Sequence, residues 1–174
     1  HAQGADENDL LISLGGIVTA TDADGDTLTA AAGGLVVTVD DDTPTASAAL
    51  LTGTVDEDGV PGGIANGIGD VPGAATIATG SAATLFNSGA DAPLTYALSL
   101  TTVATLTALN LTSAGTPLTY VLAGDTVTAS ANGGPIFTFQ LTAAGTWTFT
   151  LIDQLDHAQG ADENDLLISL GGIV

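Results

Sequence analysis

The sequence contains no lysine or arginine, whereas aspartate and glutamate together number 20, which gives a formal net charge of −20 at pH 7. No carboxylate can therefore pair with a Lys or Arg side chain of this chain. Nucleic-acid binding is excluded, because contacts to phosphates require Lys or Arg to displace counterions. Binding to anionic membranes is excluded for the same reason.

Cysteine is also absent, so no disulfide framework holds this fold. The chain has no uninterrupted apolar run of membrane-spanning length, and we expect no membrane insertion. Its first residues, HAQGADEND, lack the basic start of a secretory signal. We therefore expect any export signal to lie elsewhere in a parent protein.

The acidic residues need neutralisation from outside the sequence. Clustered like charges oppose compaction, and 17 of the 20 acids are Asp, whose short side chain brings an oxygen to a hard cation from a tight turn. Divalent cations are thus expected, with a solvated, salt-adapted surface as the alternative for isolated acids. A hydrophobic content of 45% argues against disorder and predicts a buried core.

Residues 1–18 return letter for letter as residues 157–174, which defines a period of 156 residues. An exact duplication of this kind is typical of a tandem array. The junction between repeats is expected at VTVDDDTP, residues 37–44, where a strand ends, three acids follow and Pro44 stops the ladder. We place the last strands of one repeat at 1–41 and most of the next at 42–174.

Alternation of apolar and polar residues, closed by Gly, Asp and Asn, predicts strands rather than helices. The predicted strands span residues 10–14, 17–21, 27–31, 35–39, 94–98, 118–122, 126–129, 136–141, 146–152 and 166–170. The strongest hairpin joins PIFTFQL to TWTFTLI, with Gly145 supplying a positive φ at the turn. Ser81 is expected to cap one helical turn at 81–86. Many short strands with regular turns predict an all-β, antiparallel β-sandwich.

The predicted sandwich of 42–174 lacks the counterpart of residues 19–39, so one sheet edge is expected to be open. The two identical copies would then compete for one structural place. The copy that does not occupy this place is expected to be exposed or to pair with a neighbouring identical chain, as in strand donation. A head-to-tail, self-assembling extracellular filament is therefore an alternative function to that of a repeat within one polypeptide.

The segment TDADGD is the clearest predicted metal site. Asp22, Asp24 and Asp26 stand at alternate positions around a glycine turn, so their oxygens can converge on one cation. Calcium takes six to eight oxygen ligands and tolerates irregular geometry. No flanking helix or downstream Glu in register suits an EF-hand. The alternative is an unliganded Asp-Gly turn.

Two further acidic clusters are predicted to bind cations. Near the proposed boundary, the candidate ligands are Asp40, Asp41, Asp42, Asp56, Glu57 and Asp58. Ions shared there would stiffen a linker, whereas the alternative is an acidic hinge with mutual repulsion. In the last part of the chain, the candidate ligands are Asp153, Asp156, Asp162, Glu163 and Asp165. His157 is expected to be a turn residue rather than a zinc ligand among these hard oxygen donors.

Enzymatic activity is not expected. Paired carboxylates can hydrolyse glycosides, but such a site needs a cleft, usually lined by aromatic residues. This chain has one Trp, two Tyr and four Phe, most of them on core-facing positions. The nucleophiles and electrostatic groups supplied by Cys, Lys and Arg are missing, and no G-x-S-x-G elbow is present.

The order of several motifs resembles the tandem repeats of type I-secreted giant bacterial adhesins of the RTX class, related to VCBS and cadherin-like modules. These motifs are VDEDGVPGG, LTY, GTWTFTL, LIDQLDH, ENDLLISLGGIVTATDADGD and VTVDDDTP. The resemblance implies calcium-loaded, immunoglobulin-like sandwiches that extend an adhesive region from the cell surface and support adhesion and biofilm formation. By position, it implies calcium ligands at Asp22, Asp24 and Asp26, at 56–58 and at 40–42. Ala144 departs from the pattern, because such repeats often carry Asp or Asn there.

Overall fold

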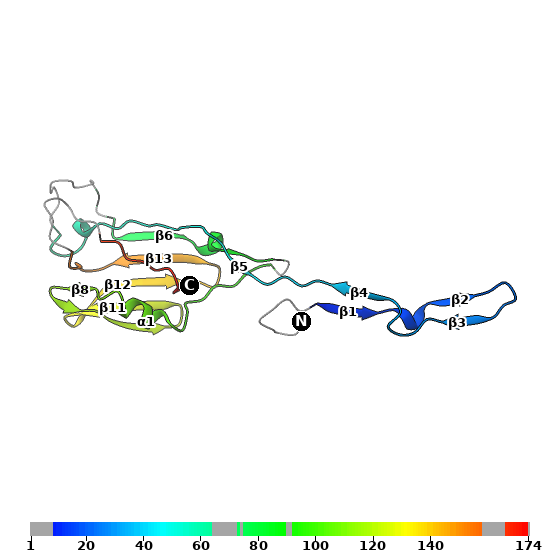
Figure 1. Cartoon of the computed structure of the whole chain (residues 1–174). Helices are drawn as coiled ribbons and strands as arrows, with labels where there is room; N and C mark the ends of the chain where they lie inside the picture. Colours follow the sequence, from blue (N-terminus) through cyan, green and yellow to red (C-terminus); the bar gives the residue numbers. More distant parts are fainter. Residues whose placement is uncertain (1–8, 64–72, 74, 90–91, 158–165, 174) are drawn as a thin grey trace. The chain divides into compact units, whose positions relative to one another are not determined.

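The computed structural model describes residues 9–63, 73, 75–89, 92–157 and 166–173 (Figure 1). The chain forms two compact units. The N-terminal unit comprises His1–Ala46 and Asn87–Pro93, and the C-terminal unit comprises Ser47–Phe86 and Leu94–Val174. The described structure is mostly β, with antiparallel sheets and one short α-helix, which confirms the expected antiparallel β class. The boundary between successive repeats, which we place between residues 41 and 42, stays a prediction.

The N-terminal unit contains two small antiparallel ladders. One pairs β1 (Leu10–Ser13) with β4 (Val36–Val39), and the other pairs β2 (Thr19–Thr21) with β3 (Thr27–Thr29). A 3-10 turn, η1 (Gly15–Ile17), connects β1 to β2. The alternating Thr and aliphatic residues suit strands, but four residues or fewer per strand enclose little. Gly15 is the only buried residue in the described part of this unit.

The C-terminal unit is built on a five-stranded antiparallel sheet with the order β10-β11-β12-β13-β6. Its strands are β6 (Ile77–Ser81), β10 (Thr119–Ala123), β11 (Thr126–Ala131), β12 (Gly134–Leu141) and β13 (Thr146–Leu151). Its shorter elements are η2 (Glu57–Gly59), η3 (Ala82–Leu85), α1 (Thr102–Thr107), β8 (Thr112–Ser113) and β9 (Thr116–Pro117). β5 (Thr45–Ala46) ends the first segment of the N-terminal unit, and β7 (Phe86–Asn87) has one residue in each unit. β8 pairs with β9, and β5 pairs with β7.

The β12–β13 hairpin confirms the strongest strand prediction. Its register places Phe137 opposite Leu151 and Phe139 opposite Phe149, so the apolar residues of both strands share a face. Gly145 adopts φ 84°, as the turn requires. The expected cap of the 81–86 turn is also confirmed, because the Ser81 hydroxyl accepts a hydrogen bond of 3.2 Å from the Ala83 N–H.

The core lies on one face of the five-stranded sheet. Phe137 and Phe149 stack with ring centroids 5.0 Å apart, and Phe137 has no exposed surface. α1 covers part of this face through Leu106, which is also fully buried. Burial of such side chains is the main force that holds the unit together, because each contributes roughly 1.5–3 kcal/mol relative to an exposed position.

Two strand predictions are wrong. Residues 94–98 and 166–170 lie in no strand, although their apolar side chains alternate inward and outward as in one. The strand predicted at 17–21 is confirmed as β2, but it begins at Thr19, because Ile17 belongs to η1. The helix α1 was not predicted: Thr102 and Leu106, four positions apart, form its buried face. No helix in the described ranges is long and apolar enough to cross a bilayer.

Candidate metal centre

The β2–β3 turn brings Asp22, Asp24 and Asp26 together as the spacing predicts. One carboxylate oxygen from each lies within 4.8 Å of the other two. The backbone N–H of Asp22 donates to the Asp26 carbonyl over 3.0 Å, which closes the loop. Gly25 adopts φ 101°, a conformation that side chains disfavour, and so permits the sharp reversal between the acids.

Hydrogen bonds hold Asp22 in its ionised form. Its Oδ1 accepts the N–H of Gly25 over 3.1 Å and that of Asp26 over 2.9 Å. The pKa of Asp22 lies below its ordinary value of 3.8, first because of a hydrogen bond with the Asp24 carboxyl and then because of these backbone donors. All three side chains are exposed. The turn is therefore a preformed, solvent-accessible group of carboxylate oxygens.

Such a group can hold a hard cation. Oxygen ligands suit Ca²⁺ and Mg²⁺, and the turn offers no nitrogen or sulfur ligand that would favour a softer metal. Among the described residues, no other set of three acidic or histidine side chains has its ligand atoms as close together. The structure identifies no ion here.

The acids at 40–42 follow β4 directly, where the predicted strand ends. Asp40 and Asp42 are exposed and Asp41 is half-buried, all within the N-terminal unit. Asp56, Glu57 and Asp58 lie in the C-terminal unit, where the Asp56 carboxylate caps η2 by accepting the Asp58 N–H over 2.9 Å. The structure therefore describes these two sets of predicted ligands in separate units.

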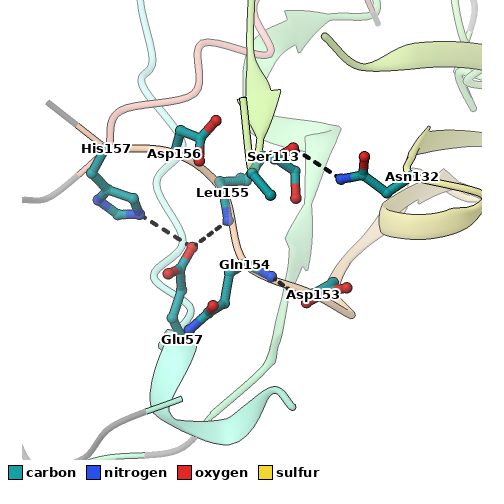
Figure 2. A pocket seen from close by; sticks show the side chains of 9 residues that line it. Glu57, Ser113, Asn132, Asp153, Gln154, Leu155, Asp156 and His157 are labelled. Atoms are coloured by element: carbon teal, nitrogen blue, oxygen red, sulfur yellow. Dashed lines mark hydrogen bonds and ion pairs between the residues drawn. The ribbon is translucent and has the colours of Figure 1, made fainter. Parts of the chain in front are cut away.

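A polar pocket of about 440 Å³ in the C-terminal unit brings together acids from two clusters that are far apart in sequence (Figure 2). Glu57 Oε1 accepts the N–H of Leu155 over 2.8 Å and lies 3.1 Å from His157 Nε2. Asp153 and Asp156 also line it, together with Gln154, whose amide donates to the Gly62 carbonyl over 3.2 Å.

Asp156 is fixed by donors from the β8–β9 turn. Its Oδ2 accepts the N–H of Gly115 over 2.8 Å, and its own N–H donates to the Thr112 carbonyl over 2.8 Å. The pKa of Asp156 is lowered, first by a hydrogen bond with the Thr112 side chain, then by backbone donors of the turn and by the charge of His157. Its carboxylate is thus already satisfied in part by the protein. The predicted ligands Asp162, Glu163 and Asp165 lie outside the described residues.

Sequence reasoning did not predict the contacts that His157 and Asn132 make in this pocket. His157 Nε2 lies 3.1 Å from Glu57 Oε1, a contact that the sequence analysis did not predict. Asn132 Nδ2 donates to the Ser113 carbonyl over 3.0 Å and joins the β11–β12 turn to β8. The Asn-Gly dipeptide at 132–133 is a hairpin signal that could have located the turn, but not its partner.

Comparison with protein-family models, curated proteins and solved structures found no match.

Proposed function

We propose that this chain is part of a calcium-stabilised structural extender repeat of a large secreted bacterial surface adhesin. The observation that carries the proposal is the convergence of Asp22, Asp24 and Asp26 in a chain without Lys or Arg. Three exposed carboxylates without a side-chain cation repel one another unless an ion from solution lies between them. Calcium suits this turn, because backbone carbonyls and water can complete its six to eight ligands.

The exact repeat supports a structural role in an array. Residues 1–18 recur after 156 residues, and a module of that period can be stacked many times, so each further copy would bring its own acidic turn. The proposed complete module is an immunoglobulin-like or cadherin-like sandwich. Its first sheet would be the five-stranded sheet of the C-terminal unit, and the strands of the next copy of residues 19–39 would contribute to the second.

Calcium would act by making the acidic modules stable and stiff. A ligand that binds only the folded state adds about 2.7 kcal/mol per site at a hundredfold excess over Kd. A few sites would therefore match much of the stability of a typical domain. Glu57, Asp153 and Asp156 form the second proposed site, and 40–42 remain predicted ligands at the repeat junction. The resemblance to adhesin repeats supports an extracellular, cell-surface location after type I secretion, and a non-enzymatic role.

Thermal unfolding with and without calcium tests this proposal. We expect the melting temperature, followed by far-UV circular dichroism, to rise by several degrees when CaCl₂ is added to EDTA-treated protein. NaCl at the same ionic strength is the control, because it screens charge without occupying a site. A melting temperature that responds equally to both salts, or to neither, would refute the calcium function.

A further inference from the structure

Residues 10–17 and 166–173 have the same sequence, LLISLGGI, but lie in different surroundings. Ile173 has no exposed surface, whereas its counterpart Ile17 is 78% exposed. The sequence of the two segments cannot explain this difference in exposure, since all eight residues are identical. It arises from what each copy packs against.

The C-terminal copy occupies a defined seat on the C-terminal unit. The Ile173 carbonyl accepts the N–H of Ser99 over 2.7 Å and the Thr102 hydroxyl over 3.3 Å, at the beginning of α1. Leu166, Ile168 and Leu170 pack against the core on alternate positions. Leu167, between them, is 89% exposed. The seat therefore recognises one face of the segment and its final isoleucine.

The seat holds its segment mainly by side-chain burial. Residues 166–170 form no strand, and no backbone bond described in the structure pairs them with one. A segment without a ladder opens at lower cost than a strand within a sheet. An identical segment from elsewhere can consequently replace it.

The N-terminal copy, by contrast, leaves its apolar side chains uncovered. Leu10 and Leu11 on β1 are 60% and 66% exposed, and Val36 and Val39 on the paired β4 are each 47% exposed. An exposed apolar surface of this kind is typical of an interaction site. The identical residues 166–173 indicate the partner of this surface, because they pack against the C-terminal unit.

We propose that Leu10–Ile17 docks into the C-terminal unit of a second copy of this chain, at the seat of Leu166–Ile173, with Ile17 in place of Ile173. The displaced segment is covalently attached and so competes at high effective concentration. Association of the unaltered chain is therefore weak. It strengthens with NaCl, because both partners are strongly acidic. The inference goes beyond the proposed extender role and does not depend on calcium.

Opposite effects of the two matched isoleucines test the proposal. In EDTA and NaCl, sedimentation velocity of the full chain should show that Ile173→Asp associates at least about tenfold more tightly than the unaltered chain, because its own segment leaves the seat. Adding Ile17→Asp to that variant should lower the association constant at least about a hundredfold, since a charge then replaces the docking side chain. Leu167→Asp is the control, because its side chain is already in solvent, and should leave the association constant unchanged.

Ile173→Ala empties the seat without adding a charge and provides the same comparison if Ile173→Asp does not fold. A folded Ile173 variant that stays monomeric at every concentration would overturn the proposal, including the case in which Ile17 docks on its own chain. Association that survives Ile17→Asp would also overturn it. The whole experiment is done without calcium, so its failure is distinct from failure of the calcium-dependent melt.

Discussion

Glu57 Oε1 accepts a hydrogen bond of 2.8 Å from the backbone N–H of Leu155, which lies 98 residues further along the chain. The same oxygen is 3.1 Å from His157 Nε2. Glu57 thereby ties η2 to the segment that leaves β13. This predicted metal ligand also has a structural role in the described contacts, and the two roles can be separated by substitution.

Glu57→Ala should destabilise the C-terminal unit by about 1–3 kcal/mol, because the N–H of Leu155, a largely buried residue, loses its acceptor. Glu57→Gln keeps an acceptor oxygen and should cost less. Urea unfolding in EDTA, followed by the fluorescence of Trp147, measures both without a contribution from metal. Equal losses for the two variants would contradict this assignment.

Trp147 lies against Gly80, its register partner across β13 and β6. A Cβ at Gly80 would approach Trp147 Cε2 to 2.6 Å, which is inside van der Waals contact. Gly80→Ala should therefore cost about 1–3 kcal/mol and shift the tryptophan emission. Gly134→Ala is the matched control, because that strand glycine has nothing within 4 Å of the added methyl group. A Gly80→Ala variant as stable as Gly134→Ala would show that the indole moves aside freely.

In the C-terminal unit, local alternation predicted which side chains face the core better than it predicted hydrogen-bonded strands. In the N-terminal unit the reverse holds, because β1 to β4 form ladders although their residues are exposed. The β12–β13 hairpin was predicted with its facing residues, because both strands and the turn are adjacent in sequence. Residues 94–98 alternate in burial just as well, yet they form no ladder: the Tyr96 N–H donates to the Ala143 carbonyl, in the turn between β12 and β13. A period of two reports burial on one face, whereas a ladder also needs a neighbouring strand edge.

The identical copies show a second limit of sequence reasoning. Residues 10–13 form β1, but the same letters at 166–169 form no strand, so tertiary context decides the outcome. The candidate sites show the same contrast between local sequence and tertiary context. Convergence of Asp22, Asp24 and Asp26 could be predicted from their spacing within one turn. The approach of Glu57 to His157 could not, since only the fold brings together residues 100 positions apart.

Low pH should lower the unfolding free energy of the C-terminal unit, which contains Asp156. The pKa of this carboxyl in the folded chain is below 3.8, so the folded state binds fewer protons than the unfolded state as the pH falls past that value. Its contribution to stability is complete above pH 3.8 and is lost as the pH falls through the folded-state pKa. Asp156→Asn should therefore lower the unfolding free energy near neutral pH and differ little from the unaltered chain in strong acid. Urea titrations across this pH range in EDTA measure the difference in unfolding free energy between the two chains. A difference that grows towards low pH would contradict this prediction.

Calcium affinity should depend on the β2–β3 turn more than on exposed acids in general. Asp24→Asn removes one charge from the cluster but leaves the backbone bonds that Asp22 accepts from Gly25 and Asp26. Loss of one charged ligand should weaken binding at this site at least about tenfold, as measured by calorimetric titration. Asp125→Asn is the control: its carboxylate is exposed but already accepts hydrogen bonds from Thr126 and Gln140, so it has no role in the cluster. Equal weakening by both variants would mean that calcium responds to total charge rather than to the geometry of the turn.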